Sequence, residues 1–131
     1  MTPENAHRTE LGFADSTQAD RAVLMLSTAP DALLAKRIAH VLVEEGLAAC
    51  VNLAAESLSM YMWEGVLEGA TEVSLTIKTR ASRAQAVANR LGQLHPYDVP
   101  EILVLDLLGG SRAYLQWLAD QTDAVQPDKA E

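Results

Sequence analysis

The sequence is poor in cysteine: Cys50 is the single one among 131 residues. No disulfide can form within the chain, which excludes a disulfide-stapled secreted fold and a four-cysteine zinc site. No apolar run approaches the roughly 20 residues that cross a bilayer, and the first 20 residues lack the apolar core of a secretory signal. These absences favour the reducing cytoplasm and argue against a membrane location.

Positive charge is also scarce, because 10 Lys and Arg stand against 18 Asp and Glu, a net charge of −8. Nucleic-acid binding needs clustered basic side chains that neutralise phosphates, so it is not expected here. The loose group of Lys78, Arg80 and Arg83 fits an ordinary solvated edge. Acidity gathers at the two ends, where 1–20 and 119–131 each hold four acids and one base, net −3.

Apolar patterning begins at Arg21 and fades near residue 120. Apolar residues make up 49 % of the chain, which is enough for one packed core at this length. We therefore expect one domain over 21–120. It lies between a disordered N-terminal extension, 1–20, and a flexible C-terminal tail, 121–131.

Within the domain the apolar period switches between two and about 3.6 residues. In chain order this predicts a strand, a helix, two extended pieces that form a hairpin with the next strand, a helix, a strand and a last helix, over 22–28, 31–45, 47–53, 57–63, 71–80, 82–94, 101–108 and 111–122. Asp31 and Ser111 are expected to cap their helices, and Ser82 with Gln85 reads as a capping box. Gly65 and Gly69 are expected to bracket a turn around Val66 and Leu67.

The βαββαβ order predicts an α+β, ferredoxin-like sandwich with an extra C-terminal helix. Right-handed crossovers place both main helices on one face of the sheet and leave the other face without a cover. The strand over 101–108 is apolar on nearly both sides and should be covered on both. Burial against sister subunits in a homo-oligomer meets both needs.

Six short stretches, in their order and spacing from about residue 22 to 118, resemble the CutA divalent-cation-tolerance family. They are LSTAPD (26–31), EGLAACVN (45–52), YMWEG (61–65), EVSLTIKT (72–79), HPYDVPE (95–101) and YLQWL (114–118). The resemblance implies a tight homotrimer with an architecture similar to the PII signalling proteins. It also implies tolerance of and response to divalent metal ions, with copper binding in some members and no settled catalytic activity.

The copper ligands that the resemblance implies are only partly present. Copper-binding members offer a Cys just before the TAPD segment and a His-His pair before PY, and this chain has Ser27 and Leu94-His95 there. His95 therefore remains as a candidate ligand for copper or another divalent cation, with Cys50 of the AACV segment as a second, softer donor. The structural alternatives are a small buried hydrophobe at Cys50 and a helix cap at His95.

Further candidates would line an intersubunit pocket or interface. Large aromatics dominate interfaces, and the polar positions of strand 71–80, including Lys78, share one sheet face. Together with Glu101, Lys78 could line a pocket between subunits, as in PII-like trimers that bind small ligands. The full set is Tyr61, Trp63, Glu64, Glu72, Lys78, Tyr97, Glu101 and Trp117.

An enzyme is not expected. The sequence has neither a phosphate-binding loop nor a dinucleotide fingerprint, and nothing supplies a third group to orient a Cys50–His95 pair. The leading hypothesis is a CutA-like divalent-cation tolerance protein that binds copper weakly. The alternatives are a PII-like trimeric sensor with a small ligand at its subunit clefts and a structural trimer that serves as a platform for partners.

Overall fold

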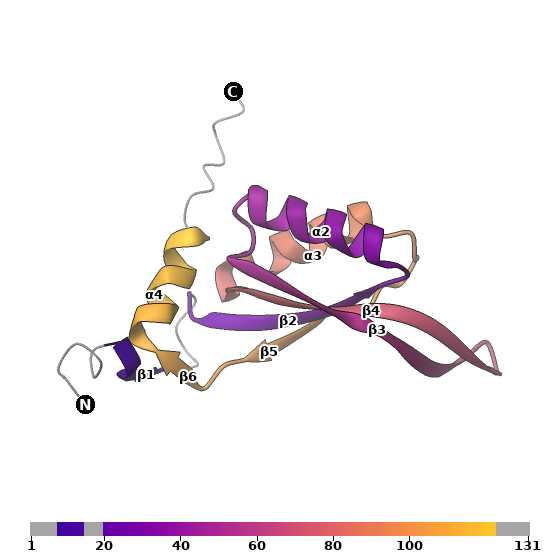
Figure 1. Cartoon of the computed structure of the whole chain (residues 1–131), viewed down its shortest axis with the longest axis horizontal. Coiled ribbons are helices and arrows are strands. Elements are labelled where there is room, and N and C mark those ends of the chain that lie inside the picture. The colour runs from indigo at the N-terminus through magenta and orange to yellow at the C-terminus, as the bar shows by residue number, and fades with distance from the viewer. Residues whose placement is uncertain (1–7, 15–19, 123–131) are drawn as a thin grey trace, which may run out of the picture.

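The computed structural model describes residues 8–14 and 20–122 of the chain (Figure 1). Most of the two ends expected to lack structure therefore lies outside the described residues. The elements, in chain order, are β1 (Leu11–Phe13), β2 (Ala22–Ala29), α2 (Ala32–Glu44), β3 (Cys50–Trp63), β4 (Val66–Arg80), the 3-10 turn η1 (Ala81–Arg83), α3 (Ala84–Leu94), β5 (Leu103–Asp106), β6 (Gly109–Ser111) and α4 (Arg112–Gln121).

Four of the strands form an antiparallel sheet in the order β3-β4-β2-β5. Helices α2 and α3 lie together on one face of this sheet, and α4 stands at one end of it (Figure 1). This is the ferredoxin-like βαββαβ arrangement with an added C-terminal helix, which confirms the predicted fold class. None of the helices in the described ranges is long and apolar enough to cross a membrane.

The core lies between the sheet and the two helices. Alternate residues of β2 and β4 point into it, and Met25 pairs with Ile77 while Ser27 pairs with Leu75. From the helices the core receives fully buried side chains such as Ile38 and Leu91. Truncating a buried residue of this size to alanine costs about 2–5 kcal/mol of stability, so this layer fixes the position of everything else.

Two of the three predicted helix caps are present. The Asp31 carboxylate accepts from the Leu34 N–H at 2.8 Å at the start of α2, and the Ser111 hydroxyl accepts from the Tyr114 N–H at 3.1 Å at the start of α4. The predicted Ser82–Gln85 capping box is wrong. The chain enters α3 through η1, and this places Arg83, with helical backbone angles and no capping oxygen, at the N-cap position.

The β3–β4 hairpin differs from its predicted form at the turn. Glu64 and Gly65 have φ values of +49° and +82°, the left-handed pair that closes a two-residue hairpin. The expected turn around Val66 and Leu67 is therefore wrong, because both residues already pair with Trp63 and Met62 in the ladder. A register shift between Leu53 and Glu56 joins the two expected extended pieces into one long strand.

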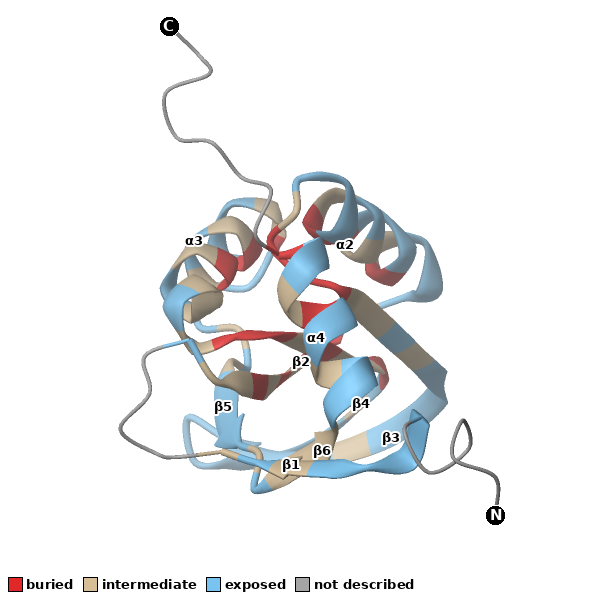
Figure 2. Cartoon of the chain, turned by 90° about the vertical axis from the view of Figure 1, so that its left-hand side faces the viewer, coloured by how far each residue is buried: buried red, intermediate tan, exposed pale blue. Residues whose placement is uncertain are grey.

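Beyond this bulge the hairpin continues past the helices as a two-stranded arm, which we define as residues 57–72 (Figure 1). Strand β5 is the opposite edge of the sheet and is shorter than the predicted 101–108. Figure 2 colours β5 as exposed in the single chain, and Leu103, Val104 and Leu105 are 52 %, 54 % and 42 % exposed. The expected cover on both sides of this strand therefore does not come from within the described chain.

Helix α4 is fastened to the sheet at its C-terminal end. Leu118 is buried, and Thr122 is fully buried at the helix end. The Thr122 hydroxyl accepts from Arg80 Nε at 2.9 Å, and its carbonyl accepts from Arg80 Nη2 at 3.2 Å and Arg83 Nε at 3.0 Å. These charge-assisted bonds tie the end of α4 to the end of β4.

A short strand lies inside the stretch expected to be disordered. Residues 11–13 form β1, which pairs antiparallel with β6 in a separate two-stranded sheet. Two flanking backbone bonds extend the pairing, from Ala14 N–H to the Leu108 carbonyl and from Arg112 N–H to the Glu10 carbonyl, both at 2.8 Å. The sequence around residues 11–13 has no apolar alternation that predicts this strand. It forms because Gly109 and Gly110 allow a second backbone to come close.

Gly109→Ala should release β1 and leave the main sheet intact. A Cβ at Gly109 would lie 2.2 Å from the Gly12 carbonyl oxygen, which is far inside van der Waals contact. Hydrogen exchange followed by NMR should show faster exchange at the Ala14 and Arg112 amides and unchanged exchange in β2 and β4. The matched control is Gly92→Ala in α3, where a Cβ meets nothing within 4 Å and should add up to about 1 kcal/mol. Unchanged protection at Ala14 would disprove the close contact.

Candidate functional site

The sheet face opposite the helices carries a polar row, as the alternation in β4 predicted. The four positions are Glu72, Ser74, Thr76 and Lys78. Three of them lie beside Thr28, Leu26 and Leu24 of β2 in the register of the sheet. At one end of this row Glu72 is buried, although it is a carboxylate. A buried carboxylate needs partners, so this end is the place to look for a site.

Glu72 lies in a small cluster with Thr28, His95 and Tyr97, which we call the Glu72 cluster. The hydroxyls of Thr28 and Tyr97 both donate to Glu72 Oε2, each at the long distance of 3.4 Å. The rings of His95 and Tyr97 lie 4.6 Å apart between centroids. Two long hydrogen bonds leave the carboxylate with room for a stronger donor.

The Tyr97 phenol responds to this environment. Although Tyr97 is 38 % exposed, partial burial of its hydroxyl raises its pKa above the ordinary value of 10.0, and the negative charge of Glu72 and its hydrogen bond raise the pKa further, with a smaller contribution from the charge of Tyr61. The proton is therefore retained on the phenol, where it donates to the carboxylate.

His95 is buried, and both of its ring nitrogens have partners. Nε2 lies 2.7 Å from the Thr28 carbonyl oxygen, and Nδ1 is 3.2 Å from the Tyr97 backbone nitrogen. Since Nδ1 accepts from an N–H, the ring proton belongs on Nε2, where it is donated to Thr28. His95 also ends α3, with its backbone N–H bonded to the Leu91 carbonyl. A metal ion at His95 would have to replace one of the two ring bonds.

Cys50 lies at the start of β3, half-buried, and pairs with Lys78. Thr28, the partner of His95, pairs with Ser74, four residues away along β4. At about 3.3 Å per residue this separates the two places by about 13 Å along the strand. The two predicted metal ligands do not converge within one chain, and no three His, Cys, Asp or Glu residues in the described ranges are grouped as a metal site.

The neighbouring Ser27 stands where the resemblance leads one to expect a cysteine. It is buried, and its Oγ has no hydrogen-bond partner among the described residues. Its register position beside Leu75 places it on the face covered by helices. An unpaired buried hydroxyl costs about 1–3 kcal/mol of folding stability, so Ser27 destabilises the single chain.

The other predicted pocket residues fall in separate places. Lys78 is at the far end of the polar row, with Nζ 3.4 Å from the Tyr114 hydroxyl and 5.6 Å from its ring centroid. The tilted rings of Tyr114 and Trp117 lie 5.3 Å apart between centroids. Tyr61 and Trp63 lie on the arm, Glu64 is in its turn, and Glu101 is exposed ahead of β5. Sequence reasoning named Glu72, His95 and Lys78 but missed their partners: Thr28, which bonds Glu72 and His95, and Tyr114, which bonds Lys78.

The family model that matches residues 23–121 is described as CutA1 divalent ion tolerance protein. The divalent-cation tolerance protein CutA of Pectobacterium atrosepticum is 50 % identical over 97 residues, which cover 74 % of this chain and 88 % of that one. The matched regions cover 65 %, 64 % and 62 % of the CutA relatives from Danio rerio, Arabidopsis thaliana and Xenopus laevis.

Solved structures agree with the sequence matches. The crystal structure of CutA from Xylella fastidiosa superposes with a TM-score of 0.77 at 40 % identity, covering 79 % of this chain and 99 % of that one. A protein from Archaeoglobus fulgidus, described as the periplasmic divalent cation tolerance protein CutA, gives 0.75 at 34 % identity over 77 % and 98 % of the two chains.

The Glu72 cluster predicts a displaced tyrosine titration. The raised pKa of Tyr97 means that the folded chain holds this proton more tightly, so its stabilising contribution is complete below pH 10.0 and is lost as pH rises through the folded value. Glu72→Gln should lower the pKa of Tyr97 towards 10.0 without reaching it, because burial remains. Ultraviolet difference spectra, assigned with Tyr97→Phe, measure this. Glu64→Gln in the hairpin turn is the control and should have no effect; an unmoved titration in Glu72→Gln would remove Glu72 as a cause.

Proposed function

The chain belongs to the CutA1 divalent ion tolerance protein family, and we propose that it serves divalent-cation tolerance as a homotrimer. The observation that carries the assembly is the apolar surface left open in the single chain. Strand β5 exposes Leu103, Val104 and Leu105 on both of its sides, although its sequence is that of a buried strand.

The arm adds a second open apolar surface. Its pairing places Met62 opposite Leu67 and Trp63 opposite Val66, so apolar side chains cover both faces of the ribbon. More than half of the surface is exposed for each of Leu58, Met60, Met62, Trp63, Val66 and Leu67. Soluble monomers rarely leave contiguous apolar patches of this kind open, and a two-stranded ribbon is marginal on its own. Burial against neighbouring subunits supports both the arm and β5.

Size exclusion with light scattering should return about three times the chain mass of 14.1 kDa at micromolar concentration. Obligate interfaces bury about 2,000 Å² or more, so free monomer should not be seen. Trp63→Ala removes a large aromatic from the arm and should weaken assembly or lower the melting temperature by the equivalent of several kcal/mol. Leu33→Ala on α2, also highly exposed, is the control and should change neither. A clean native monomer would refute the trimer.

We propose that the chain binds copper or another divalent cation weakly, with His95 as the principal ligand. Imidazole suits copper, and the longer of the two His95 ring bonds, the one from the Tyr97 N–H, is the easier to replace. Cys50 lies too far away within the chain, so it would join the site only from a neighbouring subunit. Ser27 and Leu94 offer no soft donor, and this is why we expect the affinity to be low.

Restoring the missing donors should tighten copper binding. Ser27→Cys with Leu94→His restores a thiolate and an imidazole at the two positions where the family resemblance implies them, and calorimetry against a competing chelator should show a gain of at least about tenfold. His95→Ala should abolish the binding step that these two added donors strengthen. Ser27→Ala, which removes only an unpaired hydroxyl, is the control and should leave binding unchanged. If the native chain binds copper tightly and His95→Ala has no effect, the site is wrong and Cys50 becomes the leading ligand.

A second candidate function is a PII-like sensor that binds a small ligand between subunits. Its support is the Glu72 carboxylate, buried and bonded only at 3.4 Å, near which a donor group of a ligand could bind. If no variant binds copper, this alternative leads, and a thermal-shift screen with nucleotides separates it from a trimer that only serves as a platform for partners.

We propose that the role is non-enzymatic and cytoplasmic, without nucleic acid or membrane partners. The family is described by tolerance to ions and not by a reaction. The net charge of −8 opposes a nucleic-acid surface, and the cytoplasm keeps a single thiol such as Cys50 reduced.

A further inference from the structure

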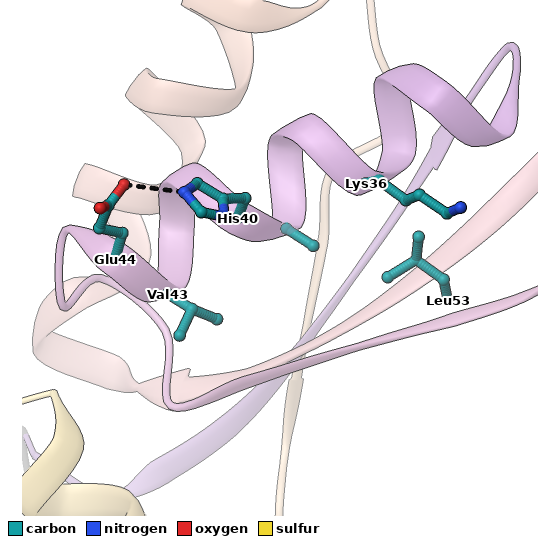
Figure 3. A pocket seen from close by; sticks show the side chains of 6 residues that line it. Lys36, His40, Val43, Glu44 and Leu53 are labelled. Atoms are coloured by element: carbon teal, nitrogen blue, oxygen red, sulfur yellow. Dashed lines mark ion pairs between the residues drawn. The ribbon is translucent and has the colours of Figure 1, made fainter.

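The outer side of α2 carries a pair of metal-ligating side chains that is separate from the Glu72 cluster. His40 and Glu44 are one helical turn apart and border a shallow groove between α2 and β3, lined also by Lys36, Ala39, Val43 and Leu53. Their side chains point towards each other, and His40 Nε2 lies 3.0 Å from Glu44 Oε1 (Figure 3). We propose that this pair is a surface binding site for a divalent transition-metal ion such as Ni(II) or Cu(II).

The spacing of the two donor atoms fits one class of coordination. Ligand atoms roughly 2.1 Å from a common ion stand about 3.0 Å apart when they form a right angle, as in octahedral or square-planar complexes, and about 3.4 Å apart in a tetrahedron. The observed 3.0 Å is an ordinary ion-pair distance and equals the right-angle spacing, so a right-angle ion fits without moving the two donor atoms apart. One nitrogen and one oxygen donor in tetragonal geometry are typical of Cu(II) and Ni(II). The ion binds the lone pairs of His40 Nε2 and Glu44 Oε1, which now face each other.

The surroundings allow an ion to enter and set a limit on its affinity. The two side chains are 70 % and 71 % exposed, so water can occupy the remaining coordination positions. Lys36 and Arg37 are positive charges four and three residues before His40; the Lys36 side chain extends towards Leu53 and away from Glu44 (Figure 3). No third His, Cys, Asp or Glu in the described ranges joins the pair, so the protein supplies two ligands.

This site does not rest on the proposed copper site or on assembly. It is built from two neighbouring turns of one helix, whereas His95 is buried against the Thr28 carbonyl. Loss of binding in His95→Ala would therefore leave the α2 site in place. Likewise, absence of binding at α2 would not affect the proposal for His95.

The test is a calorimetric titration of the full chain with NiCl2, with Cu(II) broadening of α2 amide signals in NMR spectra as the second readout. His40→Ala and Glu44→Gln should each weaken binding by at least about tenfold, because each leaves a single protein ligand. Both residues are exposed, so the variants should fold normally. His7→Ala, which removes an imidazole elsewhere, is the control and should bind like the native chain. Undetectable Ni(II) binding, or equal binding in His40→Ala, overturns the site.

A gain of affinity provides the complementary test. Lys36→His places a second imidazole, as a third ligand, on the same stripe, four residues before His40, and should tighten Ni(II) binding at least about tenfold. Ala32→His adds an exposed imidazole to the same helix but eight residues before His40, about 12 Å along the axis, so it should give no comparable gain. Equal gains in the two variants would show that any added imidazole suffices, and would overturn the geometry proposed here.

Discussion

Strand β2 is held on both sides, and this double pairing places almost every other element. Eight of its residues pair with β4 and four with β5, so its register decides which side chains meet the helices. Met25 enters the core and Thr28 reaches Glu72 only in this register, since a shift by one residue would exchange the two faces. The pairing of β2 with β4 thus determines both the polar row on one face and the buried core on the other.

Local chemistry predicted those parts of the fold that depend on neighbours in sequence. Asp31 and Ser111 cap their helices because a short acceptor side chain precedes an amphipathic run, and the alternation in β4 assigned Glu72 to the polar face. Apart from the Ser82–Gln85 capping box, the failures were positions where another strand decides the backbone. Strand β1 forms because Gly109 and Gly110 admit it, and Glu64 accepts a left-handed conformation because the two strands of the hairpin require it.

The candidate site shows the same division. Glu72, Tyr97 and His95 could each be singled out as chemically able residues, but their grouping depends on bonds such as that between His95 and Thr28, 67 positions apart in the chain. His95 also joins β2 to the loop after α3 through its ring bonds to Thr28 and Tyr97. A cation bound at the imidazole therefore competes with these hydrogen bonds. The side chains of His40 and Glu44 do not hold other elements together in this way, because they lie on the exposed side of a helix.

Strand β5 has a consequence for how the protein reaches its final state. Within the described chain it pairs only with β2, so its outer edge presents unbonded N–H and C=O groups beside apolar side chains. Such an edge is a template for any extended segment that reaches it, including another unfinished copy of the same chain. Assembly of the oligomer and aggregation therefore compete for the same newly folded chains. The faster of the two processes determines how much assembled protein forms.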